Sequence, residues 1–70
     1  MDEKKHKIID KIEDLNQSRA SLRRSLLSLE EKRGNCSEKK YEKLRLKYSK
    51  KMEKIKKRIH ELEEKMRALE

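Results

Sequence analysis

Apolar residues in the first half of the chain recur in alternating steps of four and three residues. The stripe that they form consists of Ile8, Ile12, Leu15, Arg19, Leu22, Leu26 and Leu29, with Arg19 as its polar member. This spacing is a heptad repeat with position d at Ile8 and position a at Ile12, and it keeps one side of an α-helix facing a partner helix. The pattern predicts a helix over residues 2–33.

A second heptad stripe occupies the other half of the chain. It consists of Tyr41, Leu44, Tyr48, Met52, Ile55, Ile59, Leu62, Met66 and Leu69. Two successive steps of four residues between Leu44 and Met52 form a stutter, which locally relaxes a left-handed supercoil. The stripe predicts a second helix over residues 36–69.

The segment Arg33–Glu38 separates the two stripes and contains the only glycine of a chain without proline. Gly34 suits the left-handed conformation that commonly ends a helix. Asn35 is expected to cap the second helix, with Glu38 completing a capping box. These signals predict a turn at residues 34–36.

A turn in this segment also sets the register of the two helices. Leu29 then faces Tyr41 and Ile8 faces Leu62, so that nearly every layer is apolar on both sides. One continuous helix would instead leave Tyr41 off the stripe. The sequence therefore predicts an all-α fold, a two-helix antiparallel coiled-coil hairpin in a single domain over residues 1–70, able to pair into a four-helix bundle.

Composition agrees with a coiled coil and excludes a globular core. Charged residues make up 51% of the chain and hydrophobic residues 31%, with no Phe or Trp. No apolar run is long enough for a membrane span or a signal peptide. The single cysteine excludes an internal disulfide, and we expect a cytoplasmic, reducing environment. The formal charge of +8 favours an acidic partner or surface.

One side of the predicted hairpin is strongly basic. In an antiparallel pair, the g positions of the two helices lie side by side, and the neighbouring c positions extend that side. Its candidate contacts for a polyanion or an acidic partner, which we call the lysine flank, are Lys11, Arg19, Lys40, Lys43, Lys47, Lys50, Lys54 and Arg58. The flank is either a solvated surface, in which salt screens the repulsion, or an extended docking strip.

The opposite side, at the e and b positions, carries mixed charges and a thin apolar stripe on the first helix. The stripe, which we call the mixed flank, consists of Ile9, Asn16, Ala20 and Leu27. A single two-helix seam buries little surface for its length, so a second layer would add stability. The mixed flank is therefore the candidate face of a symmetric homodimer.

No arrangement of residues indicates catalysis or a cofactor. His6 with Asp10 and His60 with Glu64 have the spacing of metal ligands, but they lie on outward positions of different helices and are read as ordinary surface residues. Cys36 in the turn could cross-link two molecules or be an unreactive loop thiol. No nucleophile with a base, paired carboxylates or phosphate-binding loop is present. We predict no enzyme activity, metal, cofactor or small-molecule substrate.

The sequence leaves two functions open. The first is a small basic coiled-coil interaction or scaffolding module that docks an acidic protein partner or forms a homodimer. The alternative is a non-specific nucleic-acid binder that contacts the phosphate backbone, since both tyrosines belong to the seam and leave no stacking platform. Membrane adsorption is disfavoured because the lysine flank has no bulky apolar residue to insert. In length and shape the chain is similar to Rop-like hairpins and to small basic hairpin proteins of the ribosome, and this resemblance assigns no functional residue.

Overall fold

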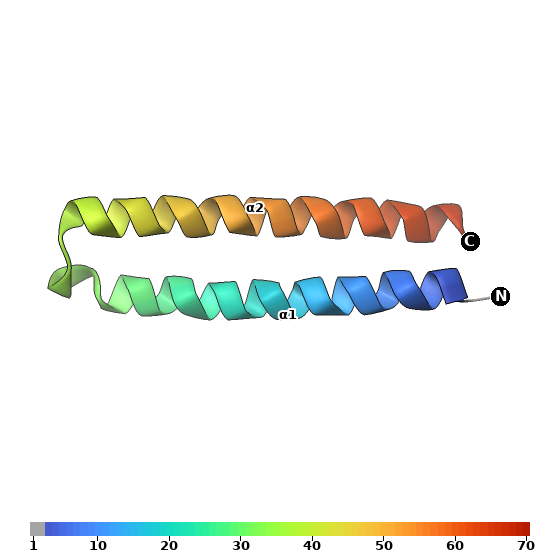
Figure 1. Ribbon diagram of the computed structural model, residues 1–70, viewed down its shortest axis with the longest axis horizontal. Coiled ribbons are helices and arrows are strands. Elements are labelled where there is room, and N and C mark those ends of the chain that lie inside the picture. The colour runs from blue at the N-terminus through green and yellow to red at the C-terminus, as the bar shows by residue number, and fades with distance from the viewer. Residues whose placement is uncertain (1–2) are drawn as a thin grey trace.

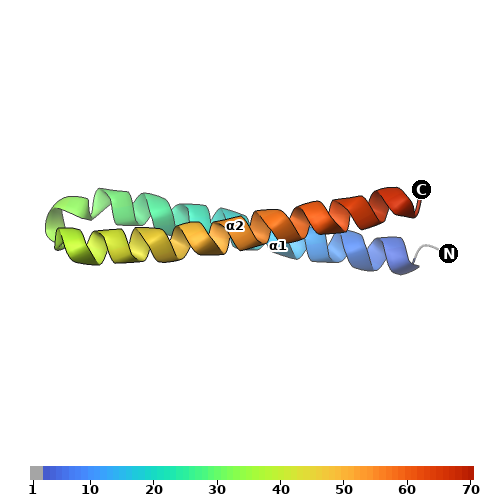
Figure 2. The ribbon, with the colours of Figure 1, turned by 90° about the horizontal axis from the view of Figure 1, so that it is seen from above.

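The computed structural model describes residues 3–70, which form two long antiparallel helices (Figure 1). Helix α1 spans Glu3–Glu31, a short 3-10 helix η1 spans Arg33–Asn35, and helix α2 spans Glu38–Ala68. The molecule is a rod of 53 × 14 × 11 Å. Seen from above, the two helices cross at a shallow angle, as helices of a coiled coil do (Figure 2). The predicted all-α helical hairpin is confirmed.

The predicted heptad stripes form the interface between the helices. Within residues 3–70 the buried residues are all seam positions, namely Leu22, Leu29, Tyr41, Ile59 and Leu62. The other seam residues are half-buried, except Leu69 near the end of α2, which is 42% exposed. Because two helices cover only one side of each other, most seam residues keep an edge open to solvent. The hairpin therefore has a narrow core along its length.

The start of α2 differs from the prediction, because Ser37 and not Asn35 is the N-cap. Ser37 has an extended backbone with φ −65° and ψ 148°, and its hydroxyl oxygen accepts a hydrogen bond of 3.2 Å from the Lys40 N–H. Asn35 belongs to η1, and the chain needs Cys36 in an extended conformation before it can enter α2. The cap therefore lies two residues later in the chain than predicted.

The end of α1 also differs from the prediction. Gly34 was expected in the left-handed conformation, yet it lies inside η1, and no residue within 3–70 has a positive φ. The Lys32 N–H is shared between the carbonyls of Ser28 at 3.1 Å and Leu29 at 3.2 Å, and Asn35 N–H donates to the Lys32 carbonyl at 2.9 Å. The helix thus ends by tightening into 3-10 geometry, in which the Ser28 and Leu29 carbonyls accept hydrogen bonds and no residue has a positive φ.

The connection between the helices is therefore wider than the predicted turn at 34–36. It runs from the residue after Glu31 to the Ser37 cap. The predicted helix bounds of 2–33 and 36–69 are correspondingly too long at the turn, whereas residue 2 lies outside the described residues. Both apolar stripes nevertheless face each other, since the heptad spacing fixes the faces independently of the loop.

Candidate docking groove

Tyr41 closes the turn end of the hairpin on the side of the mixed flank. The residue is 2% exposed, its hydroxyl donates a hydrogen bond to Glu30 Oε1, and the Arg33 guanidinium carbon lies 4.5 Å from the ring centroid. The hydrogen bond to Glu30, together with burial and the carboxylate charge, raises the pKa of Tyr41 above its usual value. Glu38 lies 3.8 Å from Arg33. These contacts cover the seam at this end on one side only.

On the lysine flank the seam is open, and hollows lie along it within the described residues. The hollow nearest the turn has a volume of about 250 Å³ and is lined by Ser25, Ser28, Leu29, Lys32, Leu44 and Tyr48. The middle hollow, of about 330 Å³, is lined by Ser18, Ser21, Leu22, Ser25, Tyr48, Lys51 and Ile55. Because these two hollows share Ser25 and Tyr48, they form one continuous depression, which we call the docking groove.

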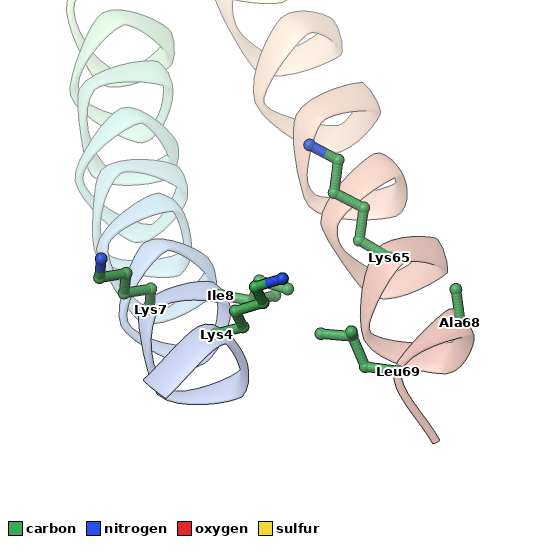
Figure 3. A pocket seen from close by; sticks show the side chains of 6 residues that line it. All are labelled: Lys4, Lys7, Ile8, Lys65, Ala68 and Leu69. Atoms are coloured by element: carbon green, nitrogen blue, oxygen red, sulfur yellow. The ribbon is translucent and has the colours of Figure 1, made fainter. Parts of the chain in front are cut away.

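The third hollow lies at the open end of the hairpin, with a volume of about 390 Å³. Its lining residues are Lys4, Lys7, Ile8, Lys65, Ala68 and Leu69. Lys4 and Ile8 of α1 point across the gap toward Leu69 of α2 (Figure 3). Its lysine rim and apolar interior repeat the chemistry of the docking groove at the other end of the same flank.

Serine side chains explain why the groove is open. Ser25 and Ser28 are half-buried at the edge of the seam, at positions where many coiled coils place long charged residues. The Ser25 hydroxyl donates to the Ser21 carbonyl of its own helix at 3.3 Å, so it does not extend across the gap. Because these serine side chains on α1 are short, the apolar seam residues are accessible to solvent from this side.

The structure exposes the predicted residues of the lysine flank to solvent. Exposed positions are Lys11, Lys40, Lys43, Lys47, Lys50, Lys54 and Arg58, whereas Arg19 is half-buried. Within residues 3–70, the ion pairs on this flank include only one of the eight: Arg58 lies 3.9 Å from Glu61. The lysines of this flank therefore keep their charges available to a partner.

Arg19, the polar member of the first stripe, is half-buried. At the stutter of α2, Met52 is half-buried and Lys51 lines the middle hollow. The sequence did not lead us to expect the groove. The signal was present in the run of serines at the g and c positions, whose small volume cannot fill the edge of a two-helix seam.

The mixed flank shows exposed apolar residues. Ile9 is 37% exposed and Leu27 is 60% exposed, while Asn16 and Ala20 are also exposed. Leu46, on the outward side of α2, is 58% exposed and was not singled out from the sequence because it lies outside the heptad stripe. The homodimer assigned to this flank stays a prediction.

Other candidate chemistry is sparse in the described part of the chain. His60 Nε2 lies 3.9 Å from Glu64, which also pairs with Arg67 at 2.9 Å, and no group of three potential metal ligands occurs within residues 3–70. Cys36 is half-buried, with its sulfur 3.9 Å from the Arg33 carbonyl oxygen. Neither described helix is apolar over a length sufficient to cross a bilayer.

Comparisons of the chain with protein families, with curated proteins and with solved structures find no match.

Proposed function

We propose that the protein is a small basic interaction module that docks an acidic protein partner along its lysine flank. The observation that carries the proposal is the coincidence of two features on one flank. The exposed lysines of this flank form no ion pair within residues 3–70, and the groove on the same flank is lined by Lys32 and Lys51 around apolar seam residues. Carboxylates of a partner would meet the lysines while its apolar side chains enter the groove. The single cysteine fits a module that works in the reducing cytoplasm.

The apolar floor favours a protein over a nucleic acid. A surface that binds phosphates needs cations and hydrogen-bond donors, and it gains nothing from open hydrophobic hollows. The Ser25 hydroxyl already donates its proton within α1. Tyr41 is buried and Tyr48 is half-buried, so neither ring offers a free face for stacking a base.

The proposal is tested by measuring binding of the protein to labelled polyglutamate and to duplex DNA at physiological salt. A flank variant replaces Lys43, Lys47, Lys50 and Lys54 with glutamine. A matched control removes the same charge from the opposite side by replacing Arg23, Arg45, Lys56 and Arg67 with glutamine. Fluorescence anisotropy measures binding, and circular dichroism verifies helix content in each variant.

We expect the flank variant to lose most of its affinity for polyglutamate and the control to retain it. Equal losses in the two variants would show that only net charge matters, and would overturn the proposal. Preferential binding to DNA, lost in the flank variant, would instead establish the nucleic-acid alternative.

Self-association through the mixed flank is a second candidate, which the 60% exposure of Leu27 favours. Burial of this side chain against a second hairpin would remove apolar surface from water. Sedimentation equilibrium at micromolar concentration measures the mass directly. A dimer that dissociates on Leu27→Glu supports this candidate, whereas an 8.6 kDa species in the unmodified protein excludes it.

A further inference from the structure

The two walls of the docking groove differ in height and charge. From α1 the groove is lined by four serines, Ser18, Ser21, Ser25 and Ser28, with Lys32 at the turn end, and the chain has no carboxylate between Asp14 and Glu30. From α2 Lys51 lines the groove, and exposed lysines follow the same flank of that helix, namely Lys40, Lys43, Lys47, Lys50 and Lys54. A bound segment would therefore meet mainly small residues along its α1 edge and positive charge along its α2 edge.

The floor of the groove suits bulky apolar side chains. Leu22 and Leu29 are almost fully buried beneath it, and Leu44, Tyr48 and Ile55 each keep an open edge. The two hollows have volumes of about 250 and 330 Å³. A cavity of about 150 Å³ in another protein holds a benzene ring, so each hollow has room for a leucine or phenylalanine side chain.

The shape of the groove selects a helix as the occupant. The lining residues of α1 run from Ser18 to Lys32, which corresponds to about 21 Å along a helix axis at 1.5 Å per residue. The groove is a straight depression between the two helices. A third helix takes this position in a coiled-coil bundle and places its apolar stripe in the groove. Small residues on the α1 wall allow such a helix to approach closely.

Charge excludes a second copy of this chain as the occupant. Each copy carries a formal charge of +8, and no stretch of its apolar seam is bordered by a continuous row of carboxylates. Like charges placed side by side across an interface oppose association. The lysine wall therefore calls for an acidic segment from a different protein.

We infer that the docking groove receives an acidic amphipathic α-helix of about four turns, whose apolar stripe fills the two hollows and whose carboxylates line the edge that faces α2. This inference rests on the proposed function and names the partner class and the binding site within it. A helix of this length is only marginally stable alone in water, so docking also stabilises the helical form of the partner segment.

The test uses designed peptides of about three heptads as probes. The first peptide has leucine at positions a and d, glutamate along one edge, and alanine or glutamine elsewhere. The second has the same composition with its glutamates moved to the outward positions. The third keeps the glutamate edge and replaces the leucines with glutamine. Titrations are followed by fluorescence anisotropy, below the concentration at which any peptide associates with itself.

The first peptide should bind about tenfold more tightly than the second, because several ion pairs with the α2 lysines add up. It should also bind at least about tenfold more tightly than the third, because the third leaves the hollows empty. Circular dichroism should show a gain of peptide helix on binding. Equal binding of the first and third peptides would overturn the inference.

Variants of the protein locate the binding site. Ser25→Trp places a large ring between the two hollows, and Gln17→Trp places the same ring on the outward side of α1 as a matched control. Ser21→Phe, at an exposed position lining the middle hollow, is a second blocking variant. We expect both blocking variants to weaken binding of the first peptide about tenfold, through loss of the apolar contacts, and Gln17→Trp to leave it unchanged.

Polyglutamate separates failure of the inference from failure of the proposed function. If polyglutamate binds through the lysine flank while the blocking variants leave peptide binding unchanged, the groove is not the receptor and the inference is wrong, but the proposed function stands. If neither polyglutamate nor any peptide binds, both the inference and the proposed function are wrong.

Discussion

The two flanks of the hairpin arise from the same heptad repeat but differ in how they cover the seam. On the side of the mixed flank, Tyr41, Glu30 and Arg33 close the turn end, and Arg45 pairs with Glu42 at 3.7 Å. On the lysine flank, serines and unpaired lysines border open hollows. Ion pairs and the Tyr41 hydrogen bond form on the first side, whereas the lysines of the other flank form no ion pair within residues 3–70 and lie beside the groove. The difference locates the candidate site where internal pairing is absent.

Both flanks depend on the seam, so a seam substitution should have the largest effect. Leu62 is 2% exposed, and Leu62→Ala should lower the free energy of unfolding by about 2–5 kcal/mol through lost burial and the resulting cavity. For a hairpin with so narrow a core, this is a large part of the total stability. The matched control is Leu46→Ala at a 58% exposed position, for which we expect a change within about 0.5 kcal/mol. Urea titration followed by circular dichroism measures both, and equal effects would contradict the assigned seam.

The next largest effect is expected at Tyr41, which closes the turn end of the hairpin on the side of the mixed flank. The pKa of Tyr41 is raised in the folded state by its hydrogen bond to Glu30, so the neutral phenol is favoured by folding. Its stabilising contribution is complete below the usual tyrosine pKa of 10.0 and is lost as the pH rises through the folded-state pKa. Tyr41→Phe should therefore lower the melting temperature at pH 7, and the difference from the unmodified protein should shrink above pH 10.

Thermal unfolding followed by circular dichroism from pH 7 to pH 11 measures this difference. Lysines also lose their charge in this range, but they do so equally in the two proteins, so the comparison isolates the phenol. Tyr48→Phe serves as a control at another seam position of the same helix, where the tyrosine lines the docking groove. A constant gap between Tyr41→Phe and the unmodified protein across the whole pH range would show that the hydrogen bond to Glu30 contributes nothing.

The turn that joins the two flanks gives a smaller, stabilising effect. Gly34 has no positive φ, and a Cβ added there would meet no atom within 4 Å. Gly34→Ala should raise the free energy of unfolding by about 0.4–1 kcal/mol, because alanine restricts the unfolded chain without strain in the folded one. Urea titration provides the value. A loss of stability would mean that the turn uses a left-handed glycine after all.

The hairpin could be predicted from sequence because heptad spacing directly encodes which side of a helix is buried. The turn could not, because Gly34 and Asn35 carry cap signals that a 3-10 helix overrides, and Ser37 offers an equally good cap two positions later. The lysine flank followed from the register. The groove beside it could not be predicted, because it depends on the combined volumes of side chains from both helices. The heptad pattern of each helix gives no information about these combined volumes.

The smallest expected effects are changes in the free energy of unfolding when charges are removed from each flank. They compare the two flanks most directly, because the changes should have opposite signs. Replacing Lys47 and Lys54 with glutamine removes repulsion between lysines and should stabilise the hairpin by a few tenths of a kcal/mol, about as much as is typical of like-charge neighbours. Replacing Arg45 and Arg67 removes ion pairs of 3.7 and 2.9 Å with Glu42 and Glu64, and should destabilise by a similar amount.

Urea titrations at low and high salt separate these electrostatic effects from changes in helix propensity, since screening at 1 M salt limits interactions between exposed charges to about 3 Å. Both differences should therefore shrink as salt is added. One informative result is that the lysine replacements both stabilise the hairpin and weaken the binding of acidic peptides. This result would show that the lysines of this flank lower the stability of the hairpin while favouring docking. If both pairs of replacements change stability in the same direction, the two flanks are electrostatically equivalent, and the lysine flank is a solvated surface.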